Sequence, residues 1–131
     1  MTFLPAPFNE LTVELGKLPG IGPRSAERLA LYLVQADPGA VHRLSQTLVA
    51  ARDRIQTCQL CGSLTEAQPC PLCVDPQRDA SLLCIVEQPV DVFSLEKTHA
   101  FRGRYHVLGG VISPLNGVGP EDLRLTPLQG R

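Results

Sequence analysis

The chain has 131 residues, 44% of them hydrophobic, and its 12 lysines and arginines against 13 aspartates and glutamates give a formal net charge of −1. This length suits one domain or a few very small ones, and this charge excludes a polybasic, histone-like nucleic-acid binder without excluding local phosphate binding. No apolar run reaches the length of a membrane span and no signal peptide is visible, so we expect a cytoplasmic protein. In that compartment the five cysteines are predicted to be metal ligands or buried thiols rather than disulfides.

Residues 1–57 are predicted to be helical. A first helix ends near Gly16, Pro23 begins a second, and Asp37 caps a third. The apolar residues of the second helix recur on one face, namely Ala26, Leu29, Ala30, Leu33 and Val34. Those of the third are Val41, Leu44, Leu48, Ala51 and Ile55. This last stripe can pack on the second helix or on another chain, and the sequence leaves both open.

A glycine-rich turn, Leu-Pro-Gly-Ile-Gly-Pro over residues 18–23, separates the first two helices. Gly20 and Gly22 permit backbone angles that other residues resist, and they leave their N–H groups uncovered. Together with the start of the next helix, these donors can hold a phosphate oxygen. Arg24 and Arg28 lie one turn apart and share a face there. We therefore predict a sequence-independent DNA-backbone contact, with a turn that only packs the helices as the alternative.

Four of the five cysteines form two Cys-x2-Cys pairs separated by eight residues: Cys58 and Cys61, then Cys70 and Cys73. Each pair can present two thiolates to one metal ion, and tetrahedral zinc accepts both pairs. The sequence predicts one structural Zn²⁺, because a stretch this small has little core and needs the metal to fold. A redox Cys-x2-Cys is the alternative, against which the nearby second copy argues. The fifth cysteine, Cys84, is predicted to be a buried thiol.

From residue 80 onward the pattern becomes α/β. Residues 82–86 are predicted to form a buried parallel strand, residues 90–97 a helix and residues 105–108 a second strand, which makes a tight βαβ unit. Glu87 directly follows the first strand, where it can bind magnesium or act as an acid or base, or simply cap the helix. The three histidines, His42, His99 and His106, have no ligand or triad spacing and are predicted to be surface or packing residues.

The order of these motifs resembles the RecR family of bacterial recombination mediators. The resemblance also rests on Leu-Cys-Ile-Val-Glu-Gln-Pro-Val-Asp-Val over residues 83–92 and on Gly-Arg-Tyr-His-Val-Leu-Gly-Gly-Val-Ile-Ser-Pro-Leu-Asn-Gly-Val-Gly-Pro-Glu-Asp over residues 103–122. It implies an α+β fold of several modules: a helix-hairpin-helix domain (1–57), a four-cysteine zinc finger (58–73) and the first βαβ part of a Toprim domain (80–131). Family members continue further, so exposed sheet edges are expected here.

The resemblance also implies a role in recombinational DNA repair, in which the protein acts with RecO and RecF to load RecA onto single-stranded DNA. Arg24 and Arg28 match the family's DNA-contacting pair, the four cysteines match its zinc ligands, and Glu87 matches an acidic Toprim position. In Toprim enzymes that glutamate works with magnesium and a later Asp-x-Asp, which this chain lacks. The family is regarded as non-enzymatic, so the resemblance implies no catalysis here. It also implies a homo-oligomer, a dimer or tetramer, that associates with the nucleoid and not with membranes.

Two other functions stay open. A magnesium-dependent Toprim-type enzyme, such as a primase or nuclease, needs a second carboxylate cluster near Glu87. The one adjacent acidic pair that follows, Glu121 and Asp122, lies in a Gly-Pro-Glu-Asp string typical of a turn or helix start. The third possibility is a zinc-stabilised module that binds only protein, which an absence of DNA binding at low salt favours.

Overall fold

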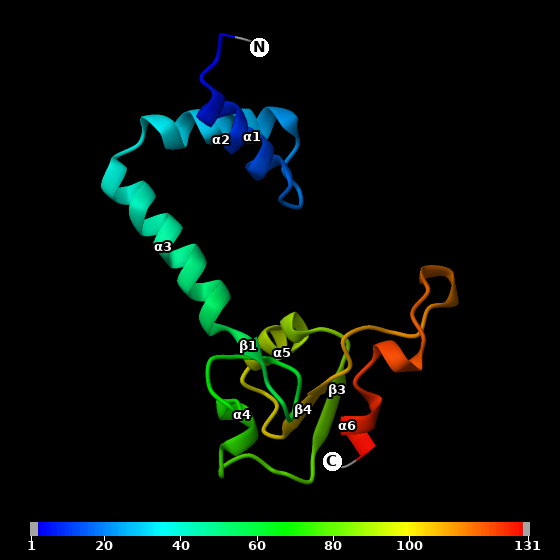
Figure 1. Cartoon of the computed structure of the whole chain (residues 1–131). Coiled ribbons are helices and arrows are strands. Elements are labelled where there is room, and N and C mark those ends of the chain that lie inside the picture. Colours follow the sequence, from blue (N-terminus) through cyan, green and yellow to red (C-terminus); the bar gives the residue numbers. More distant parts are fainter. Residues whose placement is uncertain (1–2, 130–131) are drawn as a thin grey trace. The chain divides into compact units, whose positions relative to one another are not determined.

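The computed structural model describes residues 3–129, which divide into two compact units, one within residues 1–51 and the other within residues 52–131 (Figure 1). The first contains helices α1 (Ala6–Gly16) and α2 (Pro23–Gln35) and most of α3 (Pro38–Arg54). The second contains β1 (Gln56–Thr57), β2 (Leu64–Thr65), α4 (Pro71–Val74), β3 (Leu83–Val86), α5 (Pro89–Glu96), β4 (Arg104–Val107), the 3-10 helices η1 (Pro114–Asn116) and η2 (Pro120–Asp122), and α6 (Leu125–Gln129). No helix in the described part of the chain is long and apolar enough to cross a membrane.

Helices α1 and α2 pack against each other through small residues. Ala26 and Ala30 are the buried residues of α2, and a Cβ on Gly16, at the end of α1, would contact the Cβ of Ala26 at 3.8 Å. Small side chains permit this close approach, and their burial removes apolar area from water. Helix α1 ends at Gly16 and α2 begins at Pro23, as predicted, because proline lacks an N–H that the first helical turn leaves unpaired in any case.

Helix α3 also begins as predicted. The Asp37 carboxylate accepts a hydrogen bond from the Ala40 backbone N–H at 3.1 Å, and this cap replaces a bond that the first turn lacks. The predicted apolar stripe is uncovered, however, because Leu44 is 47% and Leu48 64% exposed, while Ile55 lies just beyond the helix end. No residue of α3 is buried within the described part of the chain. The described residues therefore do not cover the apolar stripe of α3.

The segment after α3 forms a small finger. Strands β1 and β2 pair antiparallel, with Gln56 opposite Thr65, and they close the loop that carries the first two predicted ligands. The loop into α4 contains a cis peptide bond between Gln68 and Pro69. Cys70 ends this loop, and Cys73 lies in α4. The buried cluster of this finger consists of the four cysteines with Leu72 packed against them. Side-chain packing alone therefore gives the finger very little core.

Strands β3 and β4 pair in parallel over their whole length, and α5 connects them. Helix α5 begins with a cap in which the Gln88 backbone N–H donates to the Asp91 carboxylate at 2.9 Å. Val92 of α5 packs on Tyr105 and Val107 of β4, and these three residues are the buried core of the segment. The predicted βαβ unit is therefore present.

The prediction that β3 is fully buried is wrong for one of its faces. Leu83 is 37% and Ile85 51% exposed, whereas Cys84 and Val86 are half-buried and pack against the core around Val92. Cys84 is thus also less buried than predicted. Among the described residues this sheet has two strands, and α5 packs on it. Within residues 3–129 the face of β3 that carries Leu83 and Ile85 is left exposed, whereas continuous apolar strands are typical of sheets with both faces covered.

Hydrogen bonds and an ion pair connect the finger to the βαβ unit. The Val107 backbone N–H donates to the Cys61 carbonyl at 2.7 Å, so the free edge of β4 is joined to the finger. Arg78, in the segment between the two, donates to the Gly103 carbonyl at 3.0 Å and forms an ion pair with Glu96 at the end of α5. The stability of each part therefore depends on the other.

Candidate zinc centre and nucleic-acid interface

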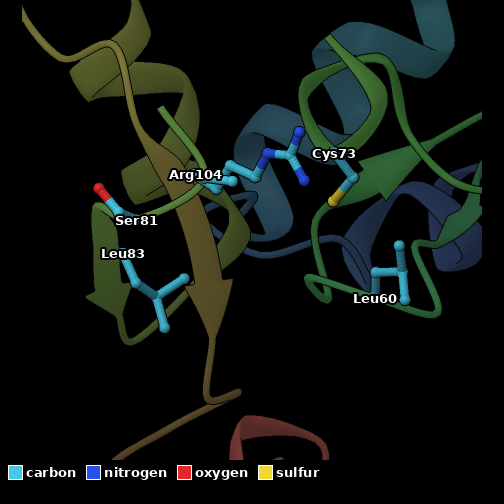
Figure 2. Close-up of a pocket in the computed structure, with 6 residues that line it drawn as sticks. Leu60, Cys73, Ser81, Leu83 and Arg104 are labelled. Atoms are coloured by element: carbon cyan, nitrogen blue, oxygen red, sulfur yellow. The ribbon is translucent and has the colours of Figure 1, made fainter. Parts of the chain in front are cut away.

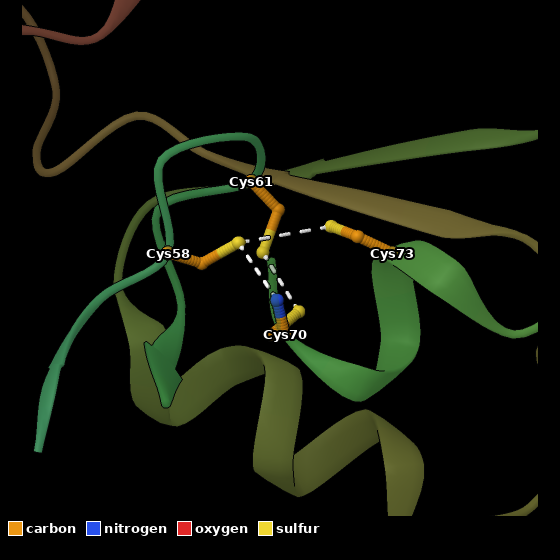
Figure 3. A group of neighbouring side chains, drawn as sticks. All are labelled: Cys58, Cys61, Cys70 and Cys73. Carbon is orange, nitrogen blue, oxygen red and sulfur yellow. Dashed lines mark hydrogen bonds between the residues drawn. The ribbon is translucent and has the colours of Figure 1, made fainter. Parts of the chain in front are cut away.

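The structure brings the four predicted cysteine ligands together (Figure 3). Their sulfur atoms all lie within 4.8 Å of one another. The Sγ atoms of Cys58 and Cys73 are 3.9 Å apart, and those of Cys61 and Cys70 are 3.5 Å apart. Four sulfurs placed tetrahedrally at roughly 2.3 Å from one ion are about 3.8 Å from each other. The donor set and its spacing therefore fit one zinc ion with no open coordination position, which is a structural site.

Backbone N–H groups around the cluster stabilise the thiolates. Ser63 donates to Cys61 Sγ at 3.4 Å, and Cys70 donates to Cys58 Sγ at 3.3 Å. Burial by itself raises the pKa of Cys58, but the backbone donors outweigh burial and lower that pKa to about 6. Burial raises the pKa of Cys70 to about 11. The protein alone therefore favours a mixture of thiol and thiolate, and a bound metal ion favours four thiolates.

A cavity of about 350 Å³ lies beside the cluster, and it is lined by Leu60, Cys73, Ala80, Ser81, Leu83 and Arg104 (Figure 2). In Figure 2 the guanidinium group of Arg104 extends from β4 toward the Cys73 side chain. The Nε atom of Arg104 is buried and has no hydrogen-bond partner within the described residues. Four thiolates around a divalent ion leave a net charge of about −2. A cation on this side of the site therefore favours the metal-bound state.

The C-terminal segment folds back onto the first cysteine loop. Gly62, in that loop, has a φ of 86°. A Cβ on Gly62 would lie 2.6 Å from Arg124 Nε and 3.0 Å from the Val107 carbonyl oxygen. The Arg124 side chain donates to the Gln59 carbonyl at 3.2 Å, and His106 Nε2 lies 2.7 Å from the Arg124 carbonyl oxygen. The loop therefore needs glycine for both its backbone angle and its close contact.

Gly62→Ala is expected to lower the free energy of unfolding by about 1–3 kcal/mol, since the left-handed backbone is strained and the Val107 carbonyl is fixed in β4. Denaturant titration measures the loss. The matched control is Gly117→Ala, because Gly117 has a φ of 71° and no atom within 4 Å of its Cβ position. The control is expected to lose only about 1 kcal/mol. Equal losses in the two variants would contradict a steric role for Gly62.

Within the described residues, the start of α2 after the glycine turn has backbone donors without a helical partner. Gly20 has a φ of 79°, which favours glycine, and neither Gly20 nor Gly22 has any atom within 4 Å of its Cβ position. No side chain caps the start of α2, so the N–H groups of Arg24 and Ser25 have no helical partner. An open helix N-terminus of this kind attracts an anion through its free donors and its dipole.

Arg24 and Arg28 continue this surface along α2. Both are exposed, and neither forms an ion pair within the described residues. They line one open cavity of about 310 Å³ together with Glu27 and Leu31. The structure thus places the four residues that the sequence singles out for DNA contact in the turn and on the first two turns of one helix.

Comparison with known proteins shows which family the chain resembles. Three protein-family models match it: the helix-hairpin-helix of RecR over residues 8–52, the four-cysteine zinc finger domain of RecR over residues 55–75 and a Toprim domain over residues 81–128. Proteins named "Recombination protein RecR" are 52% identical over 124 residues in Acidothermus cellulolyticus, 52% over 123 residues in Thermobifida fusca and 51% over 125 residues in Mycobacterium sp. strain KMS. The chain belongs to the RecR family.

These RecR relatives are longer than this chain. The alignments cover 94% or 95% of the chain but 62% of each relative. The three matched descriptions give the α+β fold of several modules that the sequence predicts. The zinc-finger match and the sulfur geometry agree on one structural zinc ion as the cofactor of this RecR-family chain.

Glu87 lies within the Toprim match of this RecR-family chain, directly after β3. Its side chain is exposed, and the four cysteines form the only group of three or more potential metal ligands in the described residues. Asp122, from the later acidic pair, accepts a hydrogen bond from the Gly119 N–H at 2.9 Å and caps η2. The described residues therefore bring no carboxylate cluster to Glu87, which magnesium chemistry requires.

Other residues of the second unit have roles that the sequence does not indicate. Three arginines from separate parts of the chain lie beside the finger, namely Arg78, Arg104 and Arg124. No spacing pattern in the sequence marks these three arginines. His42 and His99 are exposed and His106 is buried, so the histidines take the surface and packing positions that the sequence predicts.

Proposed function

We propose that this chain binds DNA independently of sequence and acts as a non-enzymatic mediator of recombinational repair in the bacterial cytoplasm, at the nucleoid. The observation that carries the proposal is the position of Arg24 and Arg28, which form no ion pair within the described residues, beside the Gly20–Gly22 turn and the uncapped start of α2. Phosphates are the part of DNA that is the same in every sequence, and cations with backbone N–H groups bind them. The recombination name of the relatives supports the same role.

The double variant Arg24→Ala/Arg28→Ala is expected to lose most DNA affinity at low salt, because two phosphate contacts disappear. Fluorescence anisotropy at several salt concentrations measures the affinity. The slope of log affinity against log salt should fall by about 1.4 for a single strand, since each phosphate contact contributes about 0.7. The control Arg43→Ala/Arg52→Ala removes the same charge from exposed positions on α3.

The control variant distinguishes a local contact from the effect of net charge. It is expected to bind DNA with nearly the wild-type affinity and salt slope. Equal losses in the two double variants would overturn the assignment of the DNA face. An absence of DNA binding by the wild-type chain at low salt would overturn the proposal itself and favour a zinc-stabilised module that binds only protein.

The proposed partners are RecO and RecF, with which the chain helps to load RecA onto single-stranded DNA. Family resemblance supports this step, and the chain spans 62% of the length of its relatives. Purified RecO and RecF tested separately against the chain by surface plasmon resonance measure the contacts. Stimulation of RecA filament assembly on strands coated by their binding protein is the expected result. A chain that binds neither partner would overturn this part of the proposal.

The proposed assembly is a homo-oligomer, a dimer or a tetramer, that presents several turns to one DNA molecule. The uncovered stripe of α3, with Leu44 and Leu48 exposed, supports it, because exposed apolar stripes are typical of interfaces. Light scattering measures the mass, and Leu48→Glu is expected to lower it. A monomer at all concentrations would contradict this part.

The proposed role includes no catalysis at Glu87. Incubation of the chain with DNA and magnesium is expected to yield neither cleavage nor synthesis. A magnesium-dependent product that disappears in Glu87→Gln would contradict the proposal and restore a Toprim-type enzyme.

A further inference from the structure

Helix α2 carries an exposed aromatic side chain, Tyr32, that has no role in the proposed phosphate contact. Tyr32 follows Arg28 at the same four-residue step by which Arg28 follows Arg24, so the three side chains succeed one another along one side of the helix. Tyr32 is 69% exposed, while Ala26 and Ala30 form the buried side. The Tyr32 ring therefore contributes little to the packing of α1 on α2.

Two open cavities lie along this side of α2. The first, of about 310 Å³, is lined by Arg24, Glu27, Arg28 and Leu31. The second, of about 430 Å³, is lined by Ser25, Arg28, Leu29 and Tyr32. Arg28 lines both cavities, so a cationic group is followed directly by an apolar and aromatic surface. A nucleotide is complementary to this surface, because its anionic phosphate is linked through a sugar to a flat, largely apolar base.

An aromatic ring beside cations distinguishes single strands from duplexes. Stacking of a base on an aromatic side chain contributes about 1–3 kcal/mol and tolerates every base. In a duplex each base is already stacked between its neighbours, whereas an unpaired strand can turn its bases toward the protein.

We propose that the side of α2 that carries Arg24, Arg28 and Tyr32 binds single-stranded DNA, with Tyr32 stacking on a base and Arg28 binding an adjacent phosphate. This inference rests on the DNA-binding function proposed above and adds a preference to it. The glycine turn and the two arginines act on any phosphate backbone. The Tyr32 ring acts only on an unpaired base, so it makes the single strand the better ligand.

Charge complementarity favours a nucleic acid over a second copy of the chain on this surface. A two-fold contact between two α2 helices centred on Arg28, the residue shared by both cavities, brings the Arg28 residues of both copies together. The approach of like charges is unfavourable, whereas a polyanion neutralises both Arg24 and Arg28.

The test compares three ligands of equal length: an oligothymidine strand, the same strand built from abasic sites, and a duplex. Fluorescence anisotropy with the full chain measures each affinity at one salt concentration. Tyr32→Ala is expected to bind oligothymidine about tenfold more weakly, which corresponds to about 1.4 kcal/mol of lost stacking. Its affinity for the abasic strand and for the duplex should not change. Tyr32→Phe keeps the ring and should bind all three ligands as the wild type does.

Tyrosine fluorescence gives a second readout that a purely structural role does not move. The chain has two tyrosines and no tryptophan, and the buried Tyr105 hydroxyl donates to Glu96 at 2.6 Å. Stacking is expected to quench the emission of Tyr32 when oligothymidine binds, and to leave it unchanged when the abasic strand binds. Tyr32→Phe removes this signal and shows that it does not arise from Tyr105.

Each remaining outcome decides between the proposals. If the wild type binds strand, abasic strand and duplex equally and Tyr32→Ala changes nothing, the stacking role is overturned while the DNA-binding function stands. If no ligand binds, the DNA-binding function itself has failed. If Tyr32→Ala weakens all three ligands together and lowers the mass measured by light scattering, this side of α2 is an interface between copies of the chain, and the inference is overturned.

Discussion

Removal of zinc is expected to unfold residues 56–74 while most of the helical content of α1 and α2 remains. The finger has almost no core besides its four cysteines, so the metal–sulfur bonds supply its folding free energy. For small zinc domains this amounts to about 10–16 kcal/mol at neutral pH. Chelation followed by residue-resolved NMR measures the effect, because amide signals of the finger should collapse while those of residues 6–35 persist.

The loss is also expected to reach the βαβ unit, because β4 donates a hydrogen bond to the Cys61 carbonyl through Val107. Cys58→Ser should behave like the chelated protein and bind little or no zinc. Cys84→Ser is the matched control, since Cys84 is half-buried and lies outside the sulfur cluster. It should retain one zinc ion per chain. A finger that keeps its amide signals after verified metal removal would contradict a structural role for zinc.

Features set by neighbouring residues could be predicted from the sequence. Helix boundaries at Gly16 and Pro23 follow from local backbone chemistry. The zinc centre follows from two Cys-x2-Cys pairs, because a short loop constrains where two sulfurs can lie. The glycine turn is likewise local, since Gly20 has the positive φ that the Gly-x-Gly pattern indicates, while its contact with DNA stays a prediction.

Features that depend on distant residues could not be predicted in the same way. The apolar run of β3 indicates burial on both faces, but burial depends on which layers cover the sheet, and one face is open. The contacts of Arg78 with Glu96 and of Arg124 with Gln59 join residues far apart in the chain. No periodicity records such pairs, because the fold alone brings them together. The sequence shows that Tyr32 follows Arg28 by one helical turn, but it does not show that the Tyr32 ring is exposed, and a contact with a ligand depends on that exposure.

Glu96→Gln is expected to lower the free energy of unfolding of the second unit by at most about 3–5 kcal/mol, the cost of breaking a buried ion pair, since it removes the main carboxylate partner of buried Arg78 and leaves Asp75 at 3.6 Å. The side chain of Arg78 is 6% exposed and that of Glu96 is 26% exposed. Arg78 also donates to the Gly103 carbonyl, and the Tyr105 hydroxyl donates to Glu96. These contacts hold the finger segment, α5 and β4 together. Denaturant titration followed by circular dichroism measures the loss.

Two further variants isolate the ion pair. Arg78→Met/Glu96→Met is expected to lose less free energy of unfolding than Arg78→Met and Glu96→Met added together, because no buried cation remains and Asp75 is 34% exposed to water. Glu66→Gln is the matched control, since Arg54 and Glu66 form an ion pair whose side chains are 68% and 60% exposed. That control should lose at most about 1 kcal/mol. Similar losses at Glu66 and Glu96 would contradict the importance of burial.

The contribution of the Glu96 carboxylate also depends on pH. Burial alone raises the pKa of Glu96, but the hydrogen bonds from Arg78 and Tyr105 outweigh burial and lower it below the ordinary value of 4.5. A lowered pKa means that the stabilisation is fully present above that ordinary value and is lost as the pH falls through the folded-state pKa. Acid also protonates the zinc thiolates, but this loss is common to the wild type and Glu96→Gln. The difference in stability between the two should therefore shrink in acid, and a constant difference would show that the carboxylate is not its source.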